Sequence, residues 1–349
     1  NRELLVIDQA TRGRFLPAGQ GVGLARKLGA DLALAAKMSG VLDSAWIHCS
    51  DADVEFPGDY FRQTEAPGRD DAAARLYRFR HRPIEDDAAY EAAQQYEISL
   101  RYYVLGLGFA GSPYAFHSIG STFAIEAESY AKVRGFPRRT AAEDFYLLNK
   151  LAKVGRVESL RGDPGRPSSR LSSRVPFGTG AAVARMLEDR ESERKTYNPA
   201  LFRYLRAWLD ALEAVLAHSG STRTREALLD DALRECCARA PGVEAERLLL
   251  CLERTGALAS ARRALCAPAR AVRGRVQDGF DGFRTLKLLH ALRDSGLEDL
   301  ALREALGRAD FLPLSGELAG MPTRELAARV EALEVSAGER TAPVQEPAR

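Results

Sequence analysis

Residues 21–53 read GVGLARKLGADLALAAKMSGVLDSAWIHCSDAD, and this stretch decides the class of fold that the sequence predicts. Its first part, residues 21–37, has the spacing of an amphipathic helix, because four apolar residues recur on one face: Leu24, Leu28, Leu32 and Ala35. The apolar run that follows, residues 44–50, predicts a buried strand.

An earlier apolar run, LLVID at residues 4–8, predicts another buried strand that ends in Asp8. Strand, helix and strand in alternation are typical of an α/β layer with a largely parallel sheet. In such sheets ligands bind beyond the carboxyl ends of the strands, which is where Asp51 and Asp53 fall. We therefore expect an α/β fold class with a ligand site just after residue 50.

The composition is that of a globular protein with ample core: 349 residues, of which 46% are hydrophobic and 28% charged. A net charge of only +2 argues against a nucleic-acid-binding protein. The five cysteines are odd in number and lack C-x-x-C spacing, which favours free thiols in a reducing compartment. The first ten residues, NRELLVIDQA, carry charges where a signal peptide is apolar. We expect a cytoplasmic protein.

Residues 102–125 contain no Asp, Glu, Lys or Arg, and their length alone would allow a membrane-spanning helix. Four glycines and Pro113 within this run weaken such a helix. We therefore expect a buried strand-and-loop region and no transmembrane segment, with peripheral membrane contact left open.

Helical patterns dominate the rest of the chain. A polar helix is expected over 83–103 and an amphipathic one over 141–155, whose apolar face comprises Phe145, Leu148, Leu151 and Ala152. Asn198 and Pro199 begin a further helix with an apolar stripe of Leu201, Leu205, Trp208, Leu212 and Val215. We expect an α/β domain over 1–185, a helical region over 186–335 and a disordered tail over 336–349.

The pair Asp51 and Asp53 points to a metal site. Carboxylates at i and i+2 of a strand share a face and repel each other unless a cation lies between them. Mg²⁺ or Mn²⁺ suits such oxygen ligands and recruits phosphate oxygens of a substrate. The alternative is a solvated turn, since 21 Asp among 349 residues give about one Asp-x-Asp by chance.

A second acidic pair, Glu143 and Asp144, lies at the expected start of the 141–155 helix, where the helix dipole favours ionised carboxylates. Three elements follow the Asp-x-Asp along the chain. They are a strand of small residues, the motif Y-x-x-V-x-G-F at 130–136, and this Glu-Asp pair. In this order the motifs resemble glycosyltransferase family 2 over residues 4–180, and GVGLARKLGAD resembles the family's helix under the donor. The resemblance implies a GT-A fold, a Rossmann-like mixed sheet flanked by helices.

The resemblance also implies a reaction: transfer of a sugar from a nucleoside-diphosphate-sugar to a hydroxyl acceptor, metal-assisted and inverting. Asp51 and Asp53 match the residues that bind the metal and the donor's ribose and diphosphate. Asp144 matches the catalytic base, which takes the acceptor's hydroxyl proton, and Glu143 would support it. His117 falls among the family's acceptor-side residues.

Four basic residues are candidates for contacts with the donor's diphosphate. Arg170 and Arg174 lie in a loop rich in Gly, Pro and Ser and could close over it with bidentate contacts, or be ordinary solvated arginines. Arg26 and Lys27 on the donor-side helix are the other two. The family's Q-x-x-R-W motif is absent near this loop.

One family element is missing: the strand-loop-helix-strand unit that holds the nucleotide base. The resemblance therefore implies an N-terminally incomplete enzyme whose nucleotide-sugar binding is weak or absent. Two alternatives stay open. Asp51 could be the nucleophile of a haloacid-dehalogenase-type phosphatase, or the chain could be a non-catalytic remnant that serves as a binding module. His48 is expected in the core, not as a ligand.

Overall fold

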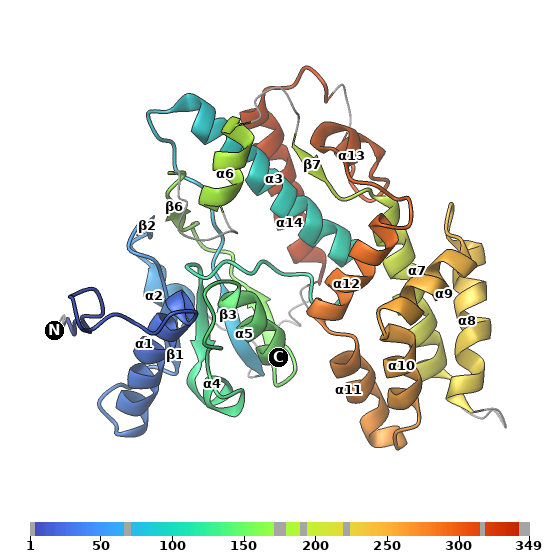
Figure 1. Ribbon diagram of the computed structural model, residues 1–349, viewed down its shortest axis with the longest axis horizontal. Helices are drawn as coiled ribbons and strands as arrows, with labels where there is room; N and C mark the ends of the chain where they lie inside the picture. Colours follow the sequence, from blue (N-terminus) through green and yellow to red (C-terminus); the bar gives the residue numbers. More distant parts are fainter. Residues whose placement is uncertain are drawn as a thin grey trace, which may run out of the picture. The chain divides into compact units, whose positions relative to one another are not determined.

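The computed structural model describes residues 4–65, 71–170, 179–188, 194–218, 224–314 and 318–341 (Figure 1). The chain divides into two compact units. Unit 1 comprises Asn1–Arg80, Ser118–Ser168 and Ser172–Ala181, and unit 2 comprises His81–His117, Ser169–Leu171 and Ala182–Arg349. Residues 81–117 therefore belong with the helical unit, whereas the boundary expected near residue 185 assigns them to the α/β domain.

The main sheet of unit 1 is mixed. It orders its strands β1 (Trp46–Cys49), β4 (Phe123–Glu126), β3 (Ala72–Leu76) and β5 (Arg156–Ser159). Strand β4 runs antiparallel to both of its neighbours, and β3 and β5 are parallel. The expectation of a largely parallel sheet is thus wrong, because β4 inserts between β1 and β3 in the opposite direction. The coarser expectation of an α/β unit is confirmed. A small ribbon pairs β2 (Val54–Glu55) with β6 (Arg166–Pro167).

The strand expected over residues 4–8 does not form. This segment is irregular, and Leu4, Leu5 and Val6 are 89%, 75% and 72% exposed. A strand needs a neighbour to pair its backbone groups, and none of the described strands pairs with this one. Apolar composition alone was therefore a misleading signal here.

Helix α1 (Gly21–Met38) forms as predicted, but the predicted face is wrong. Gly23 and Ala30 are its buried residues, whereas Leu32 is 46% exposed. The backbone N–H of Gly23 donates to the carbonyl of Arg139 at 2.9 Å. A Cβ built on Gly23 would lie 2.4 Å from the carbonyl oxygen of Pro137, so only glycine allows this approach. The helix therefore packs through its small residues.

Helix α5 (Glu143–Leu151) confirms the helix expected over 141–155, in a shorter form. It begins at Glu143 because Ala142 adopts the left-handed conformation (φ 59°). Its buried residues Leu147, Leu148 and Leu151 face the sheet strands β3 and β5, against which the helix packs. Helix α4 (Ala127–Lys132) packs on β4, and α2 (Tyr60–Gln63) completes unit 1.

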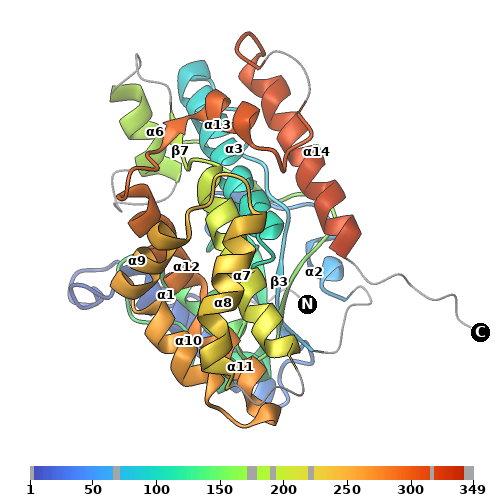
Figure 2. The ribbon, with the colours of Figure 1, turned by 90° about the vertical axis from the view of Figure 1, so that its right-hand side faces the viewer.

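Unit 2 is a helical assembly around one large apolar core. Its elements are α3 (Asp87–Phe109), α7 (Ala200–Ala217), α8 (Arg225–Arg239), α9 (Ala245–Arg254), α10 (Ala257–Leu265), α11 (Ala269–Gly279), α12 (Gly282–Arg293), α13 (Leu302–Arg308), α14 (Thr323–Thr341) and the pair β7 (Lys195–Thr196) and β8 (Leu300–Ala301). Helix α6 (Thr179–Glu188) bridges the two units in sequence. Helices α7 and α8 lie against each other (Figure 2). The predicted stripe of α7, from Leu201 to Val215, is buried.

Helix α3 corrects the expectation for residues 102–125. Its N-cap is Asp86, whose side chain accepts from the backbone N–H of Ala89 at 3.0 Å, and the helix continues to Phe109. Residues 102–109 are therefore helical, and β4 is the one strand of this run. Gly106 lets the Phe202 ring approach, since a Cβ there would lie 2.6 Å from it. None of the helices that the structure describes has the length and apolar composition needed to cross a bilayer.

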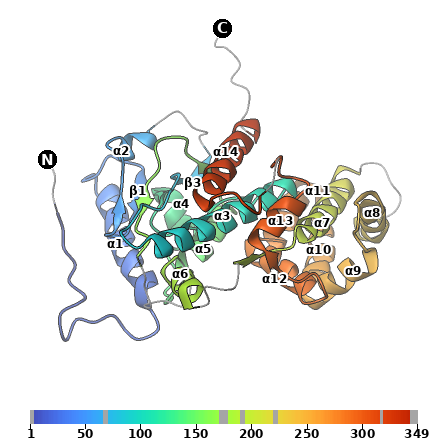
Figure 3. The ribbon, with the colours of Figure 1, turned by 90° about the horizontal axis from the view of Figure 1, so that it is seen from above.

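Helix α14 packs along α3 (Figure 3). It continues to Thr341, so the disordered tail expected from residue 336 is wrong up to that residue, and 342–349 lie outside the described residues.

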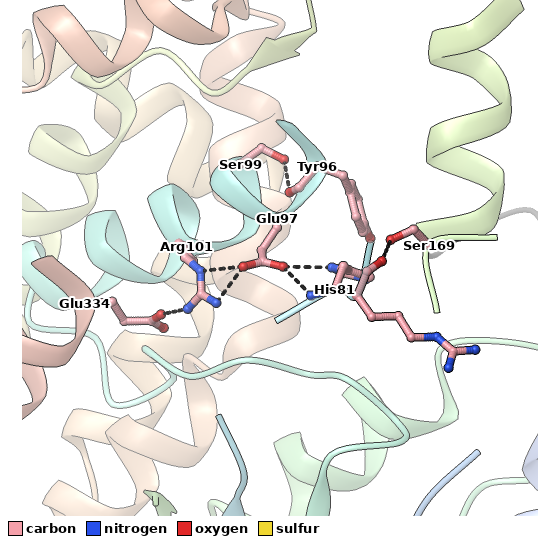
Figure 4. Close-up of polar contacts among 8 residues, drawn as sticks. His81, Tyr96, Glu97, Ser99, Arg101, Ser169 and Glu334 are labelled. Atoms are coloured by element: carbon pink, nitrogen blue, oxygen red, sulfur yellow. Dashed lines mark hydrogen bonds and ion pairs between the residues drawn. The ribbon is translucent and has the colours of Figure 1, made fainter. Parts of the chain in front are cut away.

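Buried charges join helices α3 and α14 (Figure 4). Glu97 of α3 accepts from the backbone N–H and the Nδ1 of His81, both at 2.9 Å, and lies 2.8 Å from Arg101 Nη2. Arg101 also pairs with Glu334 of α14.

Candidate functional site

The guanidinium of Arg26 joins two parts of unit 1 that are far apart in sequence. Its Nη2 lies 2.6 Å from Oδ1 of Asp51, just after β1, and its Nε lies 2.9 Å from Oε1 of Glu143, the first residue of α5. The Arg26 side chain is 11% exposed, and that of Glu143 is 5% exposed. Burial disfavours the charged form of Arg26, but the neighbouring carboxylates outweigh this effect and raise its pKa.

Asp144 lies beside this pair and is partly buried. Its Oδ1 accepts from the backbone N–H of Phe145 at 2.7 Å, and the backbone N–H of Gly120 also donates to its carboxylate. Burial, followed by repulsion from Glu143, raises the pKa of Asp144 to about 6, against the pull of these donors and of Arg26. A carboxylate with such a pKa is ionised at neutral pH and is a stronger base than an ordinary aspartate.

Gly120 is a site residue that the sequence did not reveal. A Cβ built there would lie 2.9 Å from Arg26 Nη2 and 3.1 Å from Asp144 Oδ2, so both side chains flank this glycine. Gly23 is a second such residue, because it seats α1 on the segment that leads to Glu143. The one available signal for Gly23 was its position within a helical pattern, where a glycine needs a packing reason.

Asp51 and Asp53 fit a divalent cation that takes further ligands from a substrate. The Asp51 side chain is 48% exposed even though Arg26 holds one of its oxygens, and Asp53 is partly exposed. Mg²⁺ is commonly bound through one or two carboxylates with water and substrate phosphates as the other ligands. Among the described residues no group of three or more His, Cys, Asp or Glu could hold a metal ion.

The three other basic candidates differ in what the structure describes of them. Lys27 Nζ is 3.0 Å from Asp31 Oδ1, and the hydroxyl of Tyr130 donates to the same oxygen at 2.8 Å. Arg170 is exposed and belongs to unit 2. Arg174 lies outside the described residues. Of the four predicted phosphate-binding residues, Arg26 is the one that the structure shows in contact with Asp51 and Glu143.

Two of the histidines discussed above contact other side chains of their own unit. His48 lies against the rings of Tyr60 and Phe61, and its Nδ1 is 2.8 Å from the hydroxyl of Tyr77. Burial lowers the pKa of His48 to about 4, so the ring is neutral, as a core residue is expected to be. His117 pairs with Glu334 within unit 2.

Comparisons with known proteins returned no match: no family model, no curated protein and no solved structure matches the chain.

Proposed function

We propose that this chain is a metal-assisted glycosyltransferase of the GT-A type, related to glycosyltransferase family 2. It moves a sugar from a nucleoside-diphosphate-sugar to a hydroxyl acceptor, with inversion. The observation that carries the proposal is the joining of the two predicted acidic pairs: Arg26 contacts Asp51 and Glu143, and Asp144 lies beside them with a pKa raised to about 6.

Asp144 acts as the general base. The acceptor oxygen attacks the anomeric carbon while its proton moves to the Asp144 carboxylate, and the bond from that carbon to the diphosphate breaks with the electron pair leaving on the nucleoside diphosphate. The hydrogen bonds from Phe145 and Gly120 orient the carboxylate for this step. The partial exposure of Asp144 leaves it open to an acceptor.

Asp51 and Asp53 would hold Mg²⁺ or Mn²⁺ against the donor's diphosphate. When bound, the cation supplies Lewis-acid stabilisation of the negative charge that develops on the leaving group. Asp51 is exposed, Asp53 is partly exposed, and both follow the last residue of β1 closely, so they can meet a ligand at this end of the strand. Lys27 is less suited to the diphosphate, since it is engaged by Asp31.

The transferase explains more than the alternatives do. A phosphatase with Asp51 as nucleophile leaves Glu143 and Asp144 without a role, although their burial next to each other is costly. A binding module that lacks catalysis leaves the raised pKa of Asp144 without a purpose.

The test is a screen of nucleotide sugars with Mn²⁺ on the protein, read as nucleoside diphosphate released in the presence of sugar acceptors. Asp144→Asn should lower kcat by roughly 100-fold or more, because a positioned base is worth about 10² to 10⁴. Asp210→Asn is the matched control: its carboxylate is 57% exposed on α7, and kcat should be unchanged. An Asp144→Asn variant as fast as the unaltered protein would exclude the base assignment.

The phosphatase alternative has its own readout. The readout is release of phosphate from a phosphomonoester. If Asp51→Asn loses this activity and Asp144→Asn keeps it, the protein is a hydrolase and not a transferase.

A further inference from the structure

Arg26 is the centre of the acidic site, because one buried guanidinium serves carboxylates from two parts of the chain. Asp51 and Glu143 contact it directly, and Asp144 lies next to Glu143 along α5. The negative charges of these carboxylates outnumber the single positive charge. The position of the guanidinium therefore decides how closely the acidic groups can approach one another.

The contacts of Arg26 fix the distance between two carboxylates and also balance part of their negative charge. Nε and Nη2 lie on one edge of the planar guanidinium, and here they donate to two different carboxylates, at 2.9 Å and 2.6 Å. A rigid fork of this kind holds its two acceptors at a set separation. A lysine at the same place would keep the charge but not the fork.

The backbone around Arg26 is shaped to place it. Gly23, one helical turn earlier on α1, contacts the segment before α5 without room for a side chain. On the other side, Gly120 leaves space for Arg26 Nη2 and Asp144 Oδ2 at once. These two close approaches come from different segments, and a Cβ at either position would crowd the contact made there.

We propose that Arg26 is a positioning residue. It sets the separation between Asp51, on the donor's side, and the start of α5, where Glu143 and the base Asp144 lie. This inference rests on the proposed transferase function and deepens it. It differs from a direct contact with the donor's phosphates, because the two donors of Arg26 that the structure records point to protein carboxylates. Loss of the fork shifts the base relative to the donor and leaves the donor's affinity in place.

The test separates kcat from donor binding. Arg26→Lys should lower kcat by about 10- to 100-fold, since a displacement near 1 Å can cost this much, while the donor KM changes by less than about 3-fold. Calorimetric titration with Mn²⁺ and inorganic pyrophosphate, which needs no catalysis, should give the same affinity for this variant as for the unaltered protein. Arg234→Lys is the control, because Arg234 forms an exposed pair with Glu246 on the helical unit.

The opposite pattern overturns the inference. A raised donor KM and a weakened pyrophosphate affinity with kcat kept would make Arg26 a phosphate contact, and unchanged constants would leave it without either role.

Combining Arg26→Lys with Glu143→Gln in one protein gives a second test of the positioning role. If Arg26 acts through Glu143, the double variant should lose little more in kcat than the worse single variant, and fully additive losses contradict the inference.

Failure of the function and failure of the inference give different results. If Asp144→Asn keeps full activity, or no donor is used at all, the transferase proposal fails and the inference with it. If Asp144→Asn is inactive but Arg26→Lys is not impaired, the transferase proposal stands and only the positioning role is lost. A melting temperature for each variant identifies any that does not fold, and for those the comparison uses Glu143→Gln alone, which must lower kcat without raising the donor KM.

Discussion

Asp144 is a carboxylate whose surroundings disfavour its charged form. Burial and the neighbouring Glu143 raise its pKa to about 6, from 3.8 in an exposed chain. The folded protein therefore holds a proton on this group at pH values where the unfolded chain has released it. Stability that depends on this proton is present below pH 4 and is lost as the pH rises through 6.

This shift predicts a pH-dependent difference between two variants. The free energy of unfolding of the unaltered protein should fall between pH 4 and pH 7 by about 2 to 3 kcal/mol relative to Asp144→Asn, because each pKa unit corresponds to about 1.4 kcal/mol. Urea unfolding of both proteins at the two pH values measures the difference. Asp210→Asn, which alters an exposed carboxylate, should show no such change. Parallel pH curves for the unaltered protein and Asp144→Asn would contradict the assigned environment.

The same titration governs activity under the proposed function. Asp144 must be ionised to accept a proton, so kcat/KM should rise with pH through about 6 on its acidic side.

The helices show which elements a sequence can predict. Helices α1, α5 and α7 follow from local apolar spacing, and the buried stripe of α7 matches its pattern residue by residue. The face of α1 could not be predicted in this way, since its closest contact runs through Gly23, which has no apolar side chain to count.

The strands and the site depend on partners that are distant in sequence. The direction of β4 follows from its pairing with β1 and β3, which no local pattern encodes. The run at residues 4–8 has the composition of a strand and is exposed. The acidic residues Asp51, Glu143 and Asp144 could be named from motifs, but Arg26 as their link and Gly120 as their spacer required the folded geometry.

Two glycines of α1 offer a matched pair for a prediction at this scale. Gly23→Ala should destabilise unit 1 by about 1 to 3 kcal/mol, because the added Cβ meets the backbone of Pro137 and Arg139. Gly29→Ala on the same helix meets no atom within 4 Å and should stabilise it by up to about 1 kcal/mol. Thermal unfolding of the two variants measures both effects. Equal shifts in Tm would show that the close approach of α1 is not a source of stability.

At the scale of the whole molecule, each unit has its own buried charge cluster. In unit 2, burial opposes ionisation of Glu97, but the hydrogen bond from His81 and the charge of Arg101 outweigh burial and lower its pKa to about 2. The stability that Glu97 contributes is therefore present above its unfolded pKa of 4.5 and is lost as the pH falls towards 2. We infer that acid loosens the packing of α3 on α14.

A variant tests this cluster. Glu97→Gln should lower the stability of unit 2 by about 3 kcal/mol at pH 7, since removing one partner leaves Arg101 with an incomplete set of contacts. Fluorescence of Trp208, buried in the core of unit 2, reports the unfolding in a Trp46→Phe background. Glu246→Gln, at an 80% exposed carboxylate, is the control and should change stability by less than about 0.5 kcal/mol. If Glu97→Gln lowers the free energy of unfolding no more than the control does, the buried charge cluster does not stabilise unit 2.

The exposed aliphatic run from Leu4 to Ile7 has a practical consequence for anyone who handles the protein. Each Å² of apolar surface that stays in water forgoes about 25 cal/mol of burial, so apolar resins and detergent micelles can bind these side chains. Salting-out agents strengthen that preference. Column recovery should therefore fall in concentrated sulfate and return with a mild detergent.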